Sequence, residues 1–267
     1  MAVAPVLPSS SAQEAINREL YRRADLVGEY VKVELHPPEA VALVRYRDDI
    51  QGRRVLDLGC GAGRLATYLR PLTNQYVGAD ISEHMLAYCR GHFPELKFQQ
   101  ADMRQLPFAD GAFDCVFAVF NLFDAVSHED RLRVLADVRR VLTPGGLLVF
   151  SAHNRNWKHA GSGPKLEFKL NPLSQLRCFA DYFRSRSNHK RILREQRNET
   201  DYALMNDEGH NFAVLHYYIA RDAQARQLNA AGFQLLECLD EKGETLHSGM
   251  DDSAFSSIHY IARPRGA

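Results

Sequence analysis

Apolar and polar positions along the chain alternate in blocks that predict strands followed by helices. Between the predicted strands, apolar residues recur at helical spacing, as Met85, Leu86 and Cys89 do after Ser82, which can cap that helix. Five short apolar runs are typical of buried strands, at residues 53–58, 75–80, 96–102, 113–121 and 147–153. The fourth run is almost continuously apolar, which suits a strand covered on both faces. The pattern predicts a doubly wound α/β fold with a mostly parallel sheet.

A glycine cluster follows the first predicted strand in the stretch "VLDLGCGAGR". Gly59, Gly61 and Gly63 would lie at the carboxyl end of a parallel strand, where glycines let the backbone turn tightly and let a ligand approach. The dinucleotide fingerprint needs its third glycine where Arg64 stands, and the Lys and hydroxyl residue of a P-loop are missing. The spacing therefore favours a nucleoside ligand, and a nicotinamide-dependent oxidoreductase is the weaker alternative.

Two acidic residues end the next two predicted strands. Asp80 stands 21 residues after Gly59, where an acid that binds ribose hydroxyls is expected for NAD and for any other adenosine ligand. Asp102 adds a second carboxylate at the same edge, placed to accept a hydrogen bond from an exocyclic amine or a hydroxyl. Together these acids suggest a nucleoside that is held by its sugar and its base.

These motifs, in this order, resemble the class I S-adenosylmethionine-dependent methyltransferases, which have a Rossmann-like fold. The resemblance rests on "VLDLGCGAG", Asp80, "ADMRQLPF", "FDCVFAVFN" and "VLTPGGLLVF", and it returns at "LNAAGFQLLECL" (228–239). It implies that S-adenosylmethionine is the cofactor and that the chain methylates a small molecule. The cofactor-binding residues that it implies are Gly59, Gly61, Gly63, Asp80, Ile81, Asp102, Met103, Phe120 and Asn121, with Tyr21 or Tyr30 contributed by a leading helix.

The resemblance also divides the chain into four parts. Residues 1–50 would form an N-terminal helical lid, 51–153 the cofactor-binding core, and 220–267 the last helix and strands of the core sheet. Residues 154–219 would form an α+β insertion on the substrate side. The insertion should contain a helix that opens at Pro172, with an apolar side made of Leu173, Leu176, Phe179 or Ala180, and Phe183.

Histidine and tyrosine residues on both sides of the insertion are candidates for contact with the methyl acceptor. A histidine, tyrosine or carboxylate could act as general base where the acceptor must lose a proton. The catalytic candidates are His153, Asn154, His216 and Tyr217, with His210 and Tyr218 nearby. The histidines do not follow a known metal-ligand spacing, so no metal site is predicted.

Charge narrows the range of partners without identifying one. Lys plus Arg and Asp plus Glu both number 33, which gives no bulk reason to expect nucleic acid or an anionic membrane. Residues 155–197 carry eleven basic and three acidic residues, a local surplus that leaves an RNA-binding or RNA-methylating protein as an alternative. We therefore expect a small-molecule acceptor, regard nucleic acid as disfavoured, and leave a homodimer open.

Other sequence features suggest where the protein works. The five cysteines form no C-x-x-C pair, which fits a reducing cytoplasm. The N-terminus lacks the pattern of an export signal, and no run of apolar residues is long enough to span a membrane. A cytoplasmic location is therefore expected. The sequence does not distinguish N-, O-, C- and S-methylation, because the acceptor pocket is drawn from scattered residues.

Overall fold

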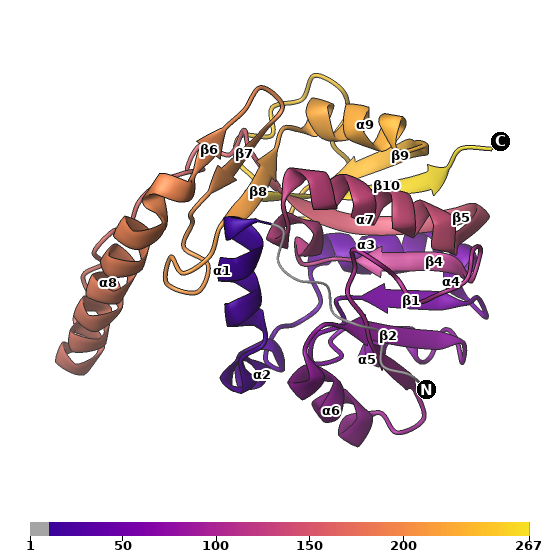
Figure 1. The fold of residues 1–267 in the computed structure, drawn as a ribbon, viewed down its shortest axis with the longest axis horizontal. Coiled ribbons are helices and arrows are strands. Elements are labelled where there is room, and N and C mark those ends of the chain that lie inside the picture. The colour runs from indigo at the N-terminus through magenta and orange to yellow at the C-terminus, as the bar shows by residue number, and fades with distance from the viewer. Residues whose placement is uncertain (1–10, 267) are drawn as a thin grey trace.

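The computed structural model describes residues 11–266, and the strands in this range form one ten-stranded sheet (Figure 1). Residues 1–10, in which no export signal is predicted, lie outside the described residues. The strands are β1 (Val55–Leu58), β2 (Tyr76–Asp80), β3 (Lys97–Gln100), β4 (Phe113–Ala118), β5 (Leu142–Asn154), β6 (Arg197–Asn198), β7 (Tyr202–Met205), β8 (His216–Ile219), β9 (Phe233–Leu239) and β10 (Ser257–Pro264). Their order is β3-β2-β1-β4-β5-β8-β7-β6, and β10 pairs with both β5 and β9.

The first five strands are parallel, as the alternation of apolar and polar blocks predicts. Leu56 pairs with Val77 on one side and with Val116 on the other, so β1 lies in the centre of this half of the sheet. The carboxyl ends of these strands therefore meet along one edge. Strand β10 runs antiparallel to β5 and places Ile258 opposite Ala152. The predicted α/β class with a mostly parallel sheet is confirmed.

Helices cover both faces of the sheet, which explains why the fourth strand is apolar at almost every position. Val116 packs in a core with α7 and α9, whereas Phe117 packs in a second core with α3, α4 and α5. The nine α-helices in residues 11–266 are α1 (Ala12–Tyr21), α2 (Val27–Tyr30), α3 (Pro37–Arg45), α4 (Arg47–Ile50), α5 (Ala66–Leu69), α6 (Glu83–His92), α7 (His128–Val141), α8 (Pro172–Ile192) and α9 (Arg221–Ala230). Ser82 precedes α6 as expected, but its hydroxyl makes no capping hydrogen bond.

The N-terminal helix α1 packs against the rest of the protein through polar side chains. The buried residues of α1 are Gln13, Glu14 and Asn17. The Gln13 amide donates to the carbonyl oxygen of Asp124 at 2.9 Å, and the Asn17 amide donates to that of Leu215 at 2.7 Å. Hydrogen bonds to two distant loops therefore set the position of this helix over the carboxyl edge of the sheet.

The insertion contains the expected helix together with a small antiparallel extension of the sheet. Helix α8 begins at Pro172, and the Asn171 side chain caps its first turn. In Figure 1 this helix projects away from the body of the protein, next to β6 and β7. Residues 216–219 form β8, which pairs in parallel with β5 and antiparallel with β7. Within the described part of the chain, no helix combines the length and the apolarity needed to cross a bilayer.

A fully buried ion pair joins helix α7 to the loop after β4. Arg131 and Asp124 are both 0% exposed, and the guanidinium donates to Asp124 Oδ1 at 2.5 Å. Arg131 also donates to the side chains of Gln224 and Gln227 on α9 at 2.7 and 3.0 Å. The ion pair therefore connects two helices with the loop that carries Asp124, and its charges have no access to water.

A second buried carboxylate holds α3 against the residue that follows the glycine cluster. Glu39 forms a bidentate ion pair with Arg64, in which one of the two contacts measures 2.7 Å. The backbone N–H of His36 also donates to Glu39 Oε2, at 2.8 Å. Burial alone would raise the pKa of Glu39, but the hydrogen bonds and charge of Arg64, together with the His36 N–H, outweigh it and lower the pKa to about 2.

We expect the Arg131→Met substitution to destabilise the fold by about 3 to 5 kcal/mol, because it leaves the Asp124 carboxylate buried without its cation. Urea unfolding of the two proteins gives this difference directly. Arg226→Met is a matched control, since Arg226 forms an exposed ion pair with Asp201 and should cost at most about 1 kcal/mol. Equal losses in the two variants would contradict the role given to the buried pair.

The Glu39 ion pair should make the free energy of unfolding depend on pH between about 4.5 and 2. Because folding lowers the pKa of Glu39 from 4.5 to about 2, its stabilisation is present above pH 4.5 and is lost as the pH falls towards 2. This term amounts to about 3 kcal/mol. Urea unfolding across this range should show a weaker pH dependence for Glu39→Gln than for the unchanged protein. The exposed Glu95→Gln is the control, and an unchanged pH dependence in Glu39→Gln would refute the assignment.

Candidate functional site

A cavity of about 1050 Å³ opens at the carboxyl edge of the parallel strands and continues under the insertion. It is large enough to hold a nucleoside and a second small molecule side by side. Most of the residues expected to bind the cofactor line it, namely Gly59, Gly61, Asp80, Ile81, Asp102, Met103, Phe120, Asn121 and Tyr21. The insertion contributes Trp157, Lys165 and Ser185, among others. The cavity therefore joins the carboxyl edge of the parallel strands to the insertion.

The three glycines of the cluster have different roles. All have positive φ angles, of 69°, 52° and 81° for Gly59, Gly61 and Gly63. A Cβ on Gly59 would lie 2.5 Å from the Leu122 side chain, and one on Gly63 would lie 2.8 Å from Phe93. A Cβ on Gly61 would meet only Tyr30, at 3.7 Å. Gly61 therefore leaves open space for a ligand. Gly63 does not line the cavity as expected, because Phe93 packs directly against it.

Asp80 is held by the backbone that surrounds it. The Gly61 N–H donates to one carboxylate oxygen at 2.9 Å, and the Ser82 N–H donates to the other at 2.8 Å. Burial raises the pKa of Asp80, and these backbone hydrogen bonds act in the opposite direction. Each carboxylate oxygen can accept more than one hydrogen bond, so the side chain can still receive a pair of hydroxyl groups from the cavity.

Asp102 lies at the cavity wall, but protein groups already engage both of its oxygens. Arg104 donates to Asp102 through Nε at 2.9 Å and through Nη2 at 2.6 Å. Burial would raise the pKa of Asp102, yet the hydrogen bonds and charge of Arg104 lower it overall. Arg104 also pairs with Glu14 of α1 at 2.7 Å. An adenine amine would therefore have to share Asp102 with an arginine that the sequence did not single out.

Phe120 and Asn121 turn from the end of β4 into the cavity. Both adopt left-handed backbone conformations, with φ of 60° and 56°, which non-glycine residues rarely adopt without a structural reason. The Asn121 N–H donates to Ser151 Oγ at 2.7 Å, and this bond holds the turn. The side-chain Oδ1 of Asn121 is buried without a hydrogen-bond partner. It is therefore an acceptor available to a ligand.

Aromatic rings from distant segments form a cover over the glycine loop. Tyr30 contacts Phe120 edge to face at 5.9 Å between ring centroids, and it stacks on His210 at 6.4 Å. Tyr21 meets His210 edge to face at 5.7 Å. Residues 210–212 are three successive left-handed residues, so the chain bends sharply there to bring His210 between the two tyrosines.

His153 is paired with the buried Asp124 at the carboxyl end of β5. Asp124 Oδ2 accepts hydrogen bonds from the backbone N–H of His153 at 2.6 Å and from its ring Nδ1 at 2.7 Å. The carboxylate fixes the proton on Nδ1, which leaves Nε2 as the acceptor nitrogen of a neutral ring. Since His153 lines the cavity, this pair has the arrangement of a histidine base oriented by a carboxylate.

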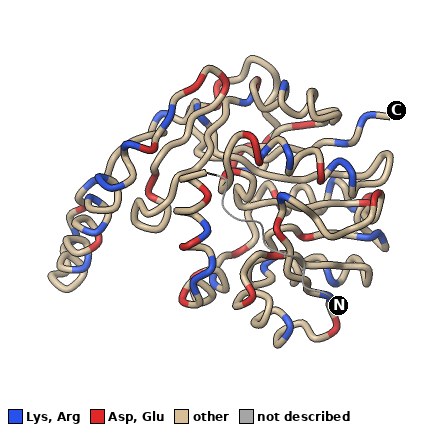
Figure 2. Tube along the Cα trace, in the orientation of Figure 1, with Lys and Arg blue, Asp and Glu red and all other residues tan. Residues whose placement is uncertain are grey.

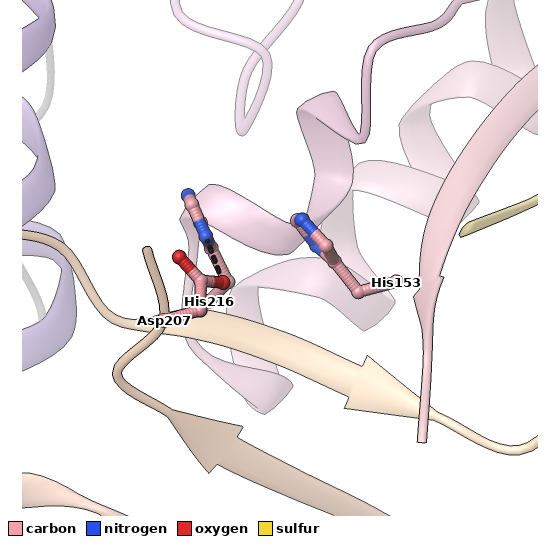
Figure 3. Close-up of side chains that lie close together, drawn as sticks. All are labelled: His153, Asp207 and His216. Carbon is pink, nitrogen blue, oxygen red and sulfur yellow. Dashed lines mark hydrogen bonds and ion pairs between the residues drawn. The ribbon is translucent and has the colours of Figure 1, made fainter. Parts of the chain in front are cut away.

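A second histidine and carboxylate pair stands next to the first. His216 Nδ1 lies 2.7 Å from Asp207 Oδ2, which also accepts from the Tyr218 hydroxyl at 2.8 Å. Burial would lower the pKa of His216, but the Asp207 charge and hydrogen bond raise it overall. His216 Nε2 contacts the Tyr21 hydroxyl at 3.0 Å. Figure 3 shows the rings of His153 and His216 side by side, with Asp207 beside His216.

The same three residues bring one potential metal-ligating atom each within 4.8 Å of one another. The geometry nevertheless favours hydrogen bonding. Asp207 already accepts from the ring and hydroxyl named above, and from the Gly209 N–H at 2.9 Å. The two imidazole rings are stacked, with centroids 4.7 Å apart and an angle of 19° between their planes, and the Nδ1 atom of each ring is already engaged by a carboxylate.

Two of the expected catalytic residues lie away from the cavity. The Asn154 amide is buried and donates to the carbonyl oxygens of Asp252 and Phe255, so it holds a loop. Tyr217 lies under the Arg131 guanidinium, 4.6 Å from its ring centroid. Successive residues of a strand point to opposite faces, and this places Tyr217 in the core while His216 and Tyr218 line the cavity.

Sequence reasoning missed Asp124 and Asp207, which orient the two histidines. A signal was present for Asp124, because it is the one acid in the apolar stretch "FNLFDAV" between the fourth strand and the following helix. Asp207 offered no comparable signal, since it lies in the polar loop "NDEGHN" among several residues of similar type.

The residues present suit S-adenosylmethionine. Gly61 provides open space at the backbone, Asp80 provides acceptors for two ribose hydroxyls, and the unpartnered Asn121 Oδ1 provides an acceptor for an ammonium or amide group. Ile81 and Met103 give the cavity apolar walls on which a flat base can pack. Asp80 ends β2 and Asn121 follows β4, the two strands that flank β1, and both residues line the same cavity.

Comparison with known proteins agrees with this assignment. A sequence profile described as "Methyltransferase domain" matches residues 55–146. The fatty-acid O-methyltransferase of Mycolicibacterium smegmatis is 38% identical over 109 residues, which are 39% of this chain and 38% of that protein. The ubiquinone/menaquinone biosynthesis C-methyltransferase UbiE of Pseudomonas fluorescens is 42% identical over 107 residues, 37% of this chain and 41% of that protein. The matches thus span about two fifths of these relatives.

Solved structures share the fold over most of the chain. The CcbJ methyltransferase of Streptomyces caelestis superposes with a TM-score of 0.61 at 18% identity, over 90% of this chain and 96% of that one. The 1,6-didemethyltoxoflavin-N1-methyltransferase of Burkholderia thailandensis, solved with its substrate and S-adenosylhomocysteine, gives 0.61 at 13% identity, over 99% and 95%. The motifs, the cavity and these likenesses together support a class I S-adenosylmethionine-dependent methyltransferase fold, with a methyltransferase domain matched over residues 55–146 and S-adenosylmethionine as the cofactor.

Proposed function

We propose that the protein transfers a methyl group to a small molecule that carries an ionisable O–H or N–H group. The observation that carries this proposal is the His153–Asp124 pair, which opens into the same cavity as Asp80 and Asn121. Cofactor binding needs no general base, whereas an acceptor that loses a proton is served by one, and a histidine oriented by a carboxylate suits that role. The location of the pair therefore supports an acceptor with a proton to give up.

The bound cofactor supplies a methyl group that is already activated by a sulfonium, so the chain has mainly to align the acceptor and receive its proton. His153 Nε2 can accept that proton while Asp124 stabilises the imidazolium that results. Arg131 holds the Asp124 side chain in place through the buried ion pair, which makes Arg131 a positioning residue for the base. His216 beside it, held by Asp207, can donate or accept a hydrogen bond at the acceptor or at Tyr21.

Residues of the insertion line the part of the cavity where we place the methyl acceptor. Trp157, His159 and Lys165 line the far side of the cavity from the glycine loop. The relatives named above are a fatty-acid O-methyltransferase and a ubiquinone/menaquinone biosynthesis C-methyltransferase, but the matches cover only 39% and 37% of this chain. The glycine spacing favours a nucleoside ligand over the nicotinamide dinucleotide of an oxidoreductase. The enclosed cavity favours one compact acceptor over RNA.

We expect Asp80→Ala to weaken binding of S-adenosylhomocysteine by about tenfold to a hundredfold, because a charged hydrogen-bond acceptor for ribose is lost. Calorimetric titration measures this, with NAD as a parallel ligand that should not bind. Asp110→Ala removes an exposed carboxylate and is the matched control. An affinity within about threefold of the unchanged protein would exclude the ribose contact.

We expect His153→Gln to lower kcat by about a hundredfold or more while leaving the affinity for S-adenosylhomocysteine unchanged. The assay follows tritiated methyl transfer from S-adenosylmethionine to a panel of phenols, carboxylic acids and amines. Because a base is needed only when the acceptor holds its proton, the activity of the variant should rise towards the unchanged protein at higher pH.

The exposed His92→Gln, on α6, provides the control for this test. Full activity of His153→Gln on every acceptor that the unchanged protein methylates would show that His153 is not the base. If the unchanged protein transfers no methyl group to any member of the panel but binds S-adenosylhomocysteine normally, the acceptor belongs to another chemical class.

A further inference from the structure

The projecting helix α8 carries apolar side chains that no part of the described chain covers. Leu173 and Leu176 are 73% and 65% exposed, and Phe183 is 65% exposed. Phe168 and Leu170, just before the helix, are more exposed still. Because these residues recur at helical spacing, they form one stripe along the helix. A stripe of this length on a soluble protein marks an interaction surface.

The opposite side of the helix is the one that faces the body of the protein. Ser185 and Ile192 are buried, and Cys178, seven residues before Ser185, is half-buried. Residues spaced by seven lie on one face of a helix, so this row anchors α8 to the insertion. The apolar stripe points away from that row. The exposed stripe is therefore a consequence of how the helix is attached.

Basic residues lie along both edges of the apolar stripe. Helix α8 carries five Lys and Arg residues and one acid, Asp181. Arg177, Arg184 and Arg191, spaced by seven, lie along one edge, and Arg186 and Lys190 lie along the other. Figure 2 shows these basic residues distributed along the projecting helix. This distribution is characteristic of a helix that lies in the plane of an anionic lipid surface.

We propose that α8 docks the protein on an anionic membrane surface, with its apolar stripe in the headgroup region and its basic edges on lipid phosphates. Pairing of two α8 helices from separate copies would bring like charges together, whereas a lipid surface complements them. The balanced charge of the whole chain gave no reason to expect a membrane, but the structure concentrates the basic residues on one helix. This docking concerns a helix that lies on the bilayer and does not cross it.

Docking would also bring the cavity close to the lipid surface. Ser185 on the inner side of α8 lines the cavity, as does Lys165 in the segment before the helix. An acceptor that dissolves in the membrane could then enter from the insertion side. This consequence rests on the proposed function, whereas the docking itself does not.

Sedimentation of the full-length protein with vesicles tests the docking. We expect the protein to sediment with vesicles of phosphatidylcholine and phosphatidylglycerol, and much less with phosphatidylcholine alone or at high salt. Leu176→Ser/Phe183→Ser should reduce the partition at least about tenfold, because two exposed apolar side chains no longer enter the interface. The control Val44→Ser/Leu132→Ser, which removes exposed apolar residues elsewhere, should bind as the unchanged protein does.

A second pair of variants tests the charges. Arg184→Gln/Arg191→Gln should lower the partition about tenfold at low salt, whereas Arg70→Gln/Arg90→Gln, far from α8, should not. S-adenosylhomocysteine affinity, measured for every variant, shows that each is folded and tests the cofactor site separately.

Three outcomes would overturn the docking proposal while S-adenosylhomocysteine binding stays normal. The first is the absence of sedimentation with either vesicle. The second is binding that depends on the arginines alone, which would indicate a general affinity for anions such as RNA. The third is a dimer in light scattering that Leu176→Ser/Phe183→Ser dissociates, because the stripe would then be covered by a second copy of the chain.

Discussion

The buried carboxylate of Asp124 is the constraint on which the arrangement of the site depends. A charge without access to water must be neutralised and hydrogen-bonded, and Asp124 obtains this from Arg131 on one side and from His153 on the other. Arg131 is in turn held by Gln224 and Gln227, so the position of α9 relative to α7 is coupled to the same charge. The orientation of the histidine ring in the cavity therefore follows from the electrostatics of the core.

The same network extends to the segment that covers the cavity. The backbone carbonyl of Asp124 accepts from Gln13, so α1 is attached to the residue that orients His153. At the other end of α1, the Tyr21 hydroxyl contacts His216. A cover attached by directional hydrogen bonds has a defined position but little buried apolar area, and such contacts can open at lower cost than a packed apolar helix. The contacts that hold α1 over the cavity are thus made to Asp124, which orients His153, and to His216 itself.

The sequence predicted the parts of the fold that depend on periodicity, and it left open those that depend on pairing. Apolar runs located the first five strands because burial on both faces excludes polar residues there. They could not show that α1 packs through Gln13, since a polar face normally indicates solvent. Likewise Gly61 and Gly63 look equivalent in sequence, and only the packing of Phe93 separates them. His216 and Tyr217 are adjacent, yet strand geometry sends them to opposite faces.

The match to known methyltransferases covers the cofactor-binding half of the site better than the half where we place the acceptor. The profile match ends at residue 146, before His153, Asp207 and His216. These residues come from the end of β5 and from the insertion, where the chain places two histidine and carboxylate pairs side by side. Burying two such pairs costs desolvation free energy, and cofactor binding alone does not require them. Asp124, the carboxylate of the first pair, lies inside the matched range, so the acceptor site that we propose joins a residue of the matched core to residues that follow it.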